Sequence, residues 1–394
     1  MAESVIVAGA RTPIGKFQGA LGGFTGMQLG GFAVAEALRR AGLTGEQIDY
    51  VLMGQVLQGG QGQITARQAA VAGGVPMTIP AITLNKVCLS GLNAVHLADV
   101  LIRAGEIEVA LAGGFESMST APYAVPSART GARMGDAKMV DLMIYDGLWD
   151  AFDHVHMGEG SDKVNAKLGI GRTEQDEWSA RSHERAADAT KAGKLAEEIV
   201  TVEVPQRKGD PVRVEEDEGI RPGTTVESLS ALKPAFSKEG TITAGNASQI
   251  SDAGAALVVM PAEKAKSLGL EPLATIVAHG QVAGPDTALH LQPANATRKA
   301  AQKASLDPSK LDMYEFNEAF AAVSLAAAKD LGLSEDKVNV NGGAVALGHP
   351  IGMSGARLIL TLAYELKRRG GGVGAAALCG GGGQGDALII RRAS

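Results

Sequence analysis

Cysteine, aromatic residues and positive charge are all scarce in this chain of 394 residues. It has 2 cysteines, Cys88 and Cys379, which lie far apart and form no Cys-x-x-Cys pair. Neither a disulfide framework nor a cysteine-rich metal site is therefore expected, and no His-x-x-x-His pair supports a metal site either. The formal net charge of -6 argues against nucleic acid as the main partner, because phosphate binding needs a basic field.

Long apolar runs are missing as well. No uninterrupted apolar run reaches the length that spans a bilayer, and residues 1–4 lack the basic region and apolar core of a signal peptide. The sequence therefore predicts no membrane association and a cytoplasmic location. A reducing compartment would keep both thiols free.

Short apolar segments alternate with segments of helical periodicity along most of the chain. This alternation predicts an α/β fold with parallel strands and right-handed crossovers. Strands are expected at residues 5–9, 50–54, 79–84, 109–114, 254–259, 274–278, 313–316, 373–379 and 386–390. Helices are expected at residues 25–40, 65–73, 90–104, 173–191, 318–330 and 354–369, and after Pro293.

The regular alternation stops between residues 115 and 249, where charge rises and Met, Pro and Gly are frequent. Within this stretch Thr173 and Asp176 are spaced as a capping box for the helix at 173–191. The pattern on either side of this stretch repeats. Before it, Ser-Gly at 90–91 is followed by a helix and then by the segment 110–114. After it, Ser-Gly at 354–355 is followed by a helix and then by the similar segment 377–381. Residues 254–259 likewise match 385–390. Unless these short matches are coincidental, the fold is a duplicated α/β domain whose first copy is interrupted by an insertion. The helix that begins with Ser-Gly, at Ser90 and again at Ser354, would then be the central helix of each half, and the two helices would pack together.

Cys88 lies where an extended apolar run ends and a helix begins. A thiol at a helix N-terminus faces unpaired N–H groups and the positive end of the helix dipole, and both favour the reactive thiolate. The alternative role is that of a small buried apolar residue, which is the usual role of a free cysteine.

Two further segments near the C-terminus favour a catalytic role for their residues over a structural one. His349 lies in the glycine-rich segment 341–355, whose glycines have no use in core packing, so function is favoured over a structural loop histidine. Cys379 ends a strand and is followed by four glycines, at the position where open α/β sheets bind ligands. Bare backbone N–H groups there can stabilise an oxyanion.

Asn317 is at a strand-to-helix junction, where it would otherwise serve as an ordinary helix N-cap. Together with Cys88, His349 and Cys379 it forms a coherent catalytic set. One thiol takes an acyl group, the imidazole accepts its proton, the second thiol moves a proton at carbon, and amide and N–H groups hold carbonyl oxygens.

Over nearly its whole length the chain resembles the thiolase family. The motifs that carry the resemblance are Asn85-Lys86-x-Cys88-x-Ser90-Gly91, Gly113-Gly114-x-Glu116-Ser117-Met118-Ser119, Asn317-Glu318-Ala319-Phe320, Asn341 to Gly355, and Cys379-x-Gly381-Gly382-Gly383-x-Gly385. The resemblance implies a thiolase-like fold with duplicated five-layered α-β-α-β-α halves and an inserted loop domain. Its expected parts are 1–118 with 249–271 (N-terminal half), 119–248 (loop domain) and 272–394 (C-terminal half).

The resemblance also implies roles for the candidate residues. Cys88 is the acyl-accepting nucleophile and His349 activates it. Cys379 abstracts the α-proton of the second acetyl-CoA, or protonates the carbanion in thiolysis. His349, with a water held by Asn317, forms one oxyanion hole, and the N–H groups of Cys88 and Gly380 form the other.

Coenzyme A contacts follow from the same resemblance. Arg221 would offer charge to the nucleotide end, and Met157 would limit the acyl length, as in the short-chain biosynthetic type. The expected contacts are Leu148, His156, Met157, Arg221, Ser228, Ala244, Ser248, Ala319 and Phe320. The histidines that match no catalytic motif, and are expected to be structural or exposed, are His96, His154, His183, His279 and His290.

The activity implied is that of an acetyl-CoA C-acetyltransferase, which condenses two acetyl-CoA to acetoacetyl-CoA and coenzyme A through an acetyl-Cys88 intermediate. Coenzyme A and its thioesters are substrates, and no metal or redox cofactor is expected. Similar enzymes form dimers or tetramers, and a homotetramer is expected here. The alternatives are a broader-chain 3-ketoacyl-CoA thiolase of fatty-acid breakdown, a non-catalytic acyl-CoA carrier and, more remotely, a redox role for the thiols.

Overall fold

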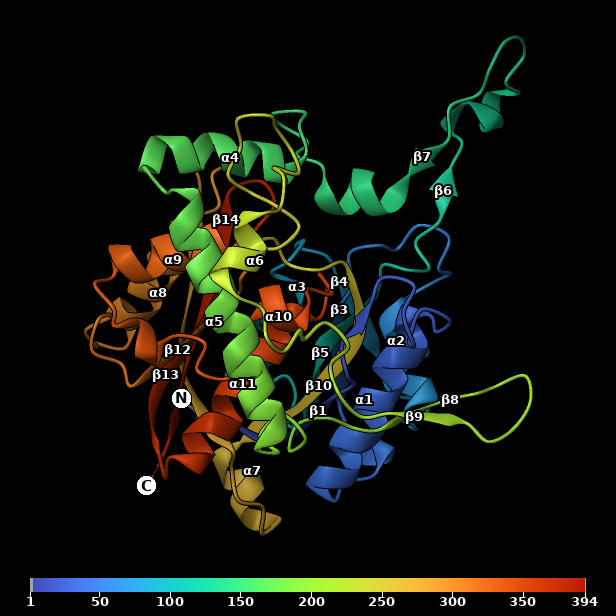
Figure 1. The fold of residues 1–394 in the computed structure, drawn as a ribbon. Helices are drawn as coiled ribbons and strands as arrows, with labels where there is room; N and C mark the ends of the chain where they lie inside the picture. The colour runs from blue at the N-terminus through green and yellow to red at the C-terminus, as the bar shows by residue number, and fades with distance from the viewer. Residues whose placement is uncertain (1–2, 394) are drawn as a thin grey trace.

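The computed structural model describes residues 3–393 as a mixed α/β fold built on one large sheet (Figure 1). The strand order is β12-β13-β14-β11-β1-β10-β5-β3-β4, and β2 pairs with β10. The strands are β1 (Ser4–Arg11), β2 (Gly15–Lys16), β3 (Tyr50–Gly54), β4 (Ala81–Leu84), β5 (Ala110–Ser117), β10 (Ser251–Pro261), β11 (Ala274–Ala283), β12 (Met313–Phe316), β13 (Gly372–Gly380) and β14 (Gln384–Arg392).

The strand directions are only partly as the sequence predicts. β3 runs parallel to β4 and β5, and β12 runs parallel to β13. The pairs of β1 with β10, β10 with β5, β11 with β14 and β13 with β14 are antiparallel, so the prediction of parallel strands is wrong there. A buried strand is apolar in either direction, and β13 and β14 are joined by a glycine hairpin rather than by a helix.

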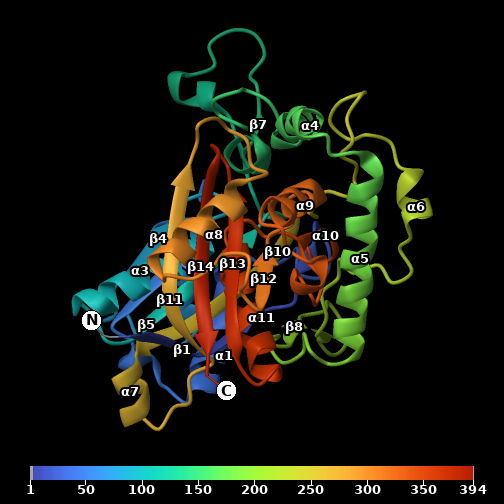
Figure 2. The same cartoon turned by 90° about the vertical axis from the view of Figure 1, so that its left-hand side faces the viewer.

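Helices separate this sheet into layers (Figures 1 and 2). Helices α1 (Gly26–Ala41) and α2 (Thr65–Ala72) cover one outer face, and α8 (Gln292–Lys303) and α9 (Ala321–Asp330) cover the other. Helices α3 (Ser90–Ala104) and α11 (Ser354–Arg368) share a third apolar core between the two halves of the sheet. The layers therefore follow the expected α-β-α-β-α order.

The two central helices pack very closely at their N-terminal ends. A Cβ atom added to Gly355 would lie 2.3 Å from the backbone nitrogen of Leu92, and one added to Gly91 would lie 2.9 Å from the carbonyl oxygen of Gly352. The predicted contact between the two Ser-Gly helices is thus confirmed. Within residues 3–393 one segment, 87–104, is long and apolar enough to cross a membrane, but 61% of it is buried in this central layer.

The strands between β5 and β10 form two small sheets, β6 with β7 and β8 with β9. The arm that carries β6 and β7 projects away from the body in Figure 1. The elements are β6 (Tyr123–Ala124), η2 (Pro126–Thr130), β7 (Val140–Asp141), η3 (Met143–Leu148), α4 (Met157–Leu168), α5 (Arg172–Lys191), β8 (Val202–Val204), β9 (Val212–Val214) and α6 (Val226–Ser230). The shorter elements elsewhere are η1 (Gly45–Gln47), α7 (Ala262–Ser267), η4 (Glu335–Lys337) and α10 (Ala344–Leu347).

Helix α5 begins one residue earlier than predicted, and the predicted capping box is wrong. Gly171 is the N-cap, and its N–H donates to Glu174 Oε1 at 2.9 Å. The Asp176 carboxylate is instead engaged by Arg172 at 2.6 Å and by the amide of Asn246 at 3.0 Å. A neighbour on the same helix and one tertiary partner thus take the carboxylate that the predicted cap would have used.

A buried ion-pair cluster fastens the 194–218 segment to β1. Arg11 donates to both oxygens of Asp217, at 2.6 and 2.9 Å, and to Glu198 at 2.7 Å. The guanidinium is fully buried, so all three charges depend on one another.

Candidate active site

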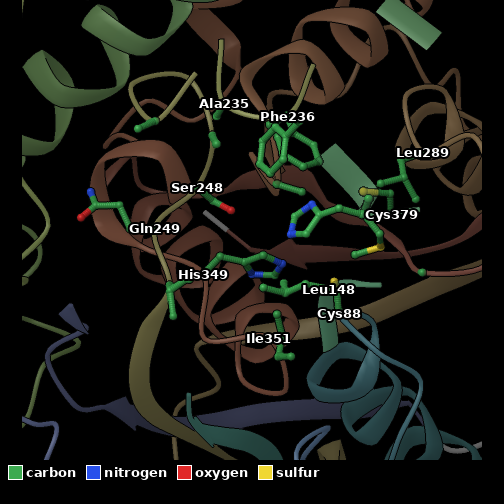
Figure 3. A pocket seen from close by; sticks show the side chains of 18 of the residues that line it. Cys88, Leu148, Ala235, Phe236, Ser248, Gln249, Leu289, His349, Ile351 and Cys379 are labelled. Carbon is green, nitrogen blue, oxygen red and sulfur yellow. The ribbon is translucent and has the colours of Figure 1, made fainter. Parts of the chain in front are cut away.

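Cys88, His349 and Cys379 reach one cavity of about 340 Å³, as Figure 3 shows. Cys88 comes from the turn between β4 and α3, His349 from the loop between α10 and α11, and Cys379 from the end of β13. All three side chains are buried. The two thiols and the imidazole, predicted as a set from separate segments of the sequence, are therefore brought together.

The turn before Cys88 is strained and tightly held. Val87 adopts φ +50°, a left-handed conformation that a β-branched residue rarely takes. Its N–H donates to Asn85 Oδ1 at 3.0 Å, and its carbonyl accepts from Ser90 Oγ at 2.6 Å. The Lys86 N–H donates to the same hydroxyl at 2.8 Å. These bonds fix the direction in which the Cys88 side chain leaves the backbone.

Burial decides the protonation state of Cys88. The N–H groups of Cys88 and Gly381 face the sulfur and favour the thiolate, in line with the sequence prediction. Burial outweighs them, with Glu116 adding to the effect, and raises the pKa of Cys88 to about 12. The resting form is therefore the neutral thiol, and the sequence prediction captured only the weaker of the two effects.

Cys379 is also a buried thiol. Burial, and then the neighbouring Cys88, raise the pKa of Cys379 well above its ordinary value. The following turn needs glycine, because Gly383 has φ +67° and its Cβ would lie 1.9 Å from the carbonyl oxygen of Asp286. Gly380 and Gly381 both line the cavity.

His349 is held as a neutral imidazole with one defined tautomer. Ser354 Oγ donates to the Pro350 carbonyl at 3.0 Å, so the 2.6 Å contact between Ser354 and His349 Nδ1 is donated by the imidazole. The lone pair is then on Nε2, where the Asn317 amide donates at 3.3 Å. Burial, with the charge of Arg357, lowers the pKa of His349 to about 3. At neutral pH the resting imidazole is therefore neutral, with no proton on Nε2.

Asn317 does not cap a helix. The helix predicted from Glu318 begins at Ala321, and Phe320 is its N-cap, so the cap alternative for Asn317 is wrong. The Asn317 N–H pairs with the Ala377 carbonyl at 3.0 Å, while no group among residues 3–393 donates to its buried Oδ1. Asn317 is not among the residues of the cavity wall, and it reaches the site through its contact with His349 Nε2.

Most of the expected coenzyme A contacts line the cavity. Arg221 and Ser228 do not: both are exposed and lie outside its wall. The expected contacts in the wall are Leu148, His156, Met157, Ala244, Ser248, Ala319 and Phe320.

Aromatic stacking shapes the apolar part of this wall. The His156 ring stacks on Phe236 with centroids 4.6 Å apart, and Phe236 meets Phe320 edge-on at 6.1 Å. Burial lowers the pKa of His156, which therefore behaves as a neutral aromatic ring. The Met157 sulfur is 3.6 Å from where a Cβ of Gly381 would lie, close to the reacting thiols.

Several residues of the site were missed from the sequence. Glu318 accepts from Trp178 and Asn339 at 2.9 and 2.8 Å, and from Ser182 at 2.7 Å, so it joins α5 to the catalytic loops. Its position beside Asn317 in a shared motif was the available signal. Ile351 of the 341–355 motif also lines the cavity. The remaining wall residues are scattered single positions with no motif: Ala235, Phe236, Thr243, Ala247, Gln249, Ile250 and Leu289.

The histidines outside the predicted set lie outside the cavity wall. His96 and His279 stack on each other, His183 Nδ1 accepts the Arg221 N–H at 3.1 Å, His290 is buried, and His154 is exposed. Among residues 3–393, no group of three or more His, Cys, Asp or Glu side chains is placed to hold a metal ion.

Comparison with known proteins gives full-length matches. The family model described as "Thiolase, N-terminal domain" matches residues 4–263, and "Thiolase, C-terminal domain" matches residues 270–392. A "Probable acetyl-CoA acetyltransferase" of Mycolicibacterium smegmatis is 57% identical over 388 residues, covering 98% of this chain and 100% of the relative.

Two further matches agree with these. An "Acetyl-CoA acetyltransferase" of Cupriavidus necator is 51% identical over 392 residues and covers 100% of both chains. The crystal structure of the Bacillus anthracis acetyl-CoA acetyltransferase has a TM-score of 0.96 at 42% identity and covers 99% of both chains.

Proposed function

The chain belongs to the thiolase family, and from that premise we propose that it is an acetyl-CoA C-acetyltransferase. It condenses two acetyl-CoA to acetoacetyl-CoA and coenzyme A, and runs the reverse thiolysis. The observation that carries the proposal is the convergence of Cys88, His349 and Cys379 in one buried, largely apolar cavity.

The first half-reaction acylates Cys88. His349 Nε2 accepts the thiol proton, and the sulfur attacks the thioester carbonyl of acetyl-CoA. Because burial raises the pKa of Cys88 to about 12, proton transfer accompanies the attack instead of preceding it. When the tetrahedral intermediate collapses, Cys379 gives its proton to the departing coenzyme A thiolate. The enzyme then holds acetyl-Cys88, an imidazolium at His349 and a thiolate at Cys379.

The second half-reaction forms the carbon–carbon bond. The Cys379 thiolate takes an α-proton from a second acetyl-CoA, and the resulting carbanion attacks the acetyl group on Cys88. Acetoacetyl-CoA leaves, and His349 returns its proton to the Cys88 sulfur. Each thiol thus recovers its proton, and no other reactant is needed.

Two sets of donors stabilise the oxyanions. His349 and a water held by Asn317 form one set, which the unpaired Asn317 Oδ1 supports. The N–H groups of Cys88 and Gly380 form the other, and the Gly381 N–H also faces the Cys88 sulfur. A positioned base contributes roughly 10²–10⁴-fold and each oxyanion donor roughly 10²–10³-fold, so both are needed for enolate chemistry.

We propose that residues 119–248 act as a substrate-binding domain over the halves 1–118 with 249–271 and 272–394. A depression of about 390 Å³ shares Ala235 and Phe236 with the catalytic cavity and includes Lys233 and Lys238. These lysines, together with Arg221, would offer positive charge to the nucleotide phosphates of coenzyme A despite the acidic chain.

The test separates the two thiols. With labelled acetyl-CoA, Cys88→Ser should form no cysteine-bound acetyl-enzyme, whereas Cys379→Ala should acylate but make no acetoacetyl-CoA. Equal labelling of wild type and Cys88→Ser would refute the assignment, and condensation by Cys379→Ala would refute the role of the second thiol. Absence of any turnover by the wild type with acetoacetyl-CoA and coenzyme A would favour a non-catalytic carrier.

Chain length is tested with the same enzyme. Acetoacetyl-CoA should be cleaved far faster than a long-chain 3-ketoacyl-CoA, because Met157 lies against the glycines beside the thiols. Comparable rates would instead favour the broader-chain 3-ketoacyl-CoA thiolase.

We further propose a cytoplasmic homotetramer. The arm between β6 and β7 supports assembly, because its residues are largely exposed and Met134 is 96% exposed. Light scattering at micromolar concentration would give the mass, and a monomer would refute this part.

A further inference from the structure

Gln249 lines the catalytic cavity, but its amide group is turned away from the cavity centre in Figure 3. We propose that Gln249 is a positioning residue: its amide fastens the end of α10 and thereby holds His349 in place for the chemistry. The effect on catalysis rests on the proposed function, whereas the contacts of Gln249 are hydrogen bonds of the structure itself.

Helix α10 has four residues and ends immediately before Gly348 and His349. The last carbonyl groups of a helix have no partner within it and need one from elsewhere. Gln249 Nε2 donates to the carbonyls of Val345 at 3.0 Å and Ala346 at 3.1 Å. Both residues are buried, so water does not take the place of the amide.

The same residue also holds His349 through its main chain. The His349 N–H donates to the Gln249 carbonyl at 3.0 Å and to Ser251 Oγ at 3.2 Å. The intervening Gly348 has φ +113°, so the chain turns sharply between α10 and His349. Gln249 therefore supports this turn from both of its ends, with the side chain on one and the carbonyl on the other.

The same amide group, whose two hydrogens are shared among three carbonyls, extends the connection to the segment that carries Arg221. Gln249 Nε2 donates to the Gly219 carbonyl at 2.9 Å, and the Arg221 N–H pairs with His183. A Cβ on Gly219 would lie 2.8 Å from this nitrogen, so the two segments are in direct contact. One amide thus joins the imidazole that accepts the Cys88 proton to the segment proposed to face the nucleotide.

Two substitutions distinguish hydrogen bonding from space filling. Gln249→Ala removes the donor and leaves three carbonyls without it. Gln249→Glu keeps the size of the side chain, but its carboxylate has no N–H to donate and would face carbonyl oxygens. If donation matters, both variants lose activity, and Glu is no better than Ala. If Gln249 only fills space, Glu resembles the wild type and Ala alone is impaired.

The experiment measures thiolysis of acetoacetyl-CoA at pH 8 and, separately, the carboxamidomethylation of Cys88 by iodoacetamide, which needs no thioester. We expect Gln249→Ala and Gln249→Glu to lower kcat by about 10–100-fold, as a small displacement of a catalytic group does. Alkylation of Cys88 should slow by about tenfold, with the melting transition retained. Gln206→Ala is the matched control, because that amide donates only to the Val204 carbonyl on an exposed hairpin.

Wild-type rates in Gln249→Ala, or activity within twofold of wild type in Gln249→Glu, would overturn the inference. If either variant does not fold, Gln249→Asn replaces it: the shorter amide should fold and show an intermediate loss, and wild-type rates would again overturn the role. A wild type that does not cleave acetoacetyl-CoA would refute the proposed function instead. The alkylation comparison would still test Gln249 in that case.

Discussion

A buried histidine beside the cavity wall should make the protein sensitive to acid. His290 Nε2 is 2.7 Å from Asn165 Oδ1, so the imidazole N–H donates there and fastens the chain next to Leu289 to α4. No acceptor among residues 3–393 faces its buried Nδ1. Burial lowers the pKa of His290 to about 4, so the folded protein holds it neutral.

The size of the effect follows from proton linkage. An unfolded histidine titrates at about 6.5, so between that value and about pH 4 the unfolded chain binds a proton that the folded chain does not. Stability is therefore lost as the pH falls through this window. From pH 7 to pH 5 the unfolded state gains about 2 kcal/mol from this proton, and the folded state gains less than about 0.1 kcal/mol.

The measurement is urea unfolding of the wild type, His290→Gln and His154→Gln at pH 7 and pH 5, followed by tryptophan fluorescence. The fall in unfolding free energy on acidification should be smaller by about 2 kcal/mol in His290→Gln than in the wild type. His154 is exposed, so its variant should follow the wild type. An equal fall in all three proteins would refute the reasoning.

Three further changes have defined outcomes. His349→Ala should lower kcat by about 10²–10⁴-fold in protein that still folds, and a kcat within a few-fold of wild type would remove His349 from the mechanism. Arg221→Ala should raise the KM for coenzyme A several-fold with kcat unchanged, whereas unchanged KM would exclude the contact. Arg11→Met should lower the urea-derived unfolding free energy by about 3–5 kcal/mol, because Asp217 and Glu198 stay buried without their partner; a loss below about 1 kcal/mol would contradict this.

Much of the fold could be predicted because the local signals agree with the tertiary structure. The strand at 50–54 has the predicted bounds, and helix 354–368 ends one residue before the predicted position. The repeated Ser-Gly helix pattern correctly predicted that the two central helices pack against each other. Strand direction could not be read, because an apolar strand gives no sign of whether its neighbour runs parallel. The start of α9 was missed, because residues 317–320 stay outside the helix and Ala319 and Phe320 pair instead with the 246–248 segment.

The candidate site divides in a similar way. Cys88, His349 and Cys379 stand in motifs that their chemistry makes recognisable, and they do converge. The balance of forces on the Cys88 sulfur could not be predicted, since burial depends on residues distant in the sequence. Phe236 and Gln249 carry no motif either: the role of each depends on which ring or carbonyl the fold brings near.

The two central helices approach each other most closely near the residues that carry the chemistry. Cys88 precedes α3 and His349 precedes α11. The distance between nucleophile and base therefore depends on how closely the N-terminal ends of these two helices approach each other. Bare glycine backbone at Gly91 and Gly355 makes that approach possible. A single methyl group at either position would therefore force the two helices apart and lower turnover, although neither position lines the substrate cavity.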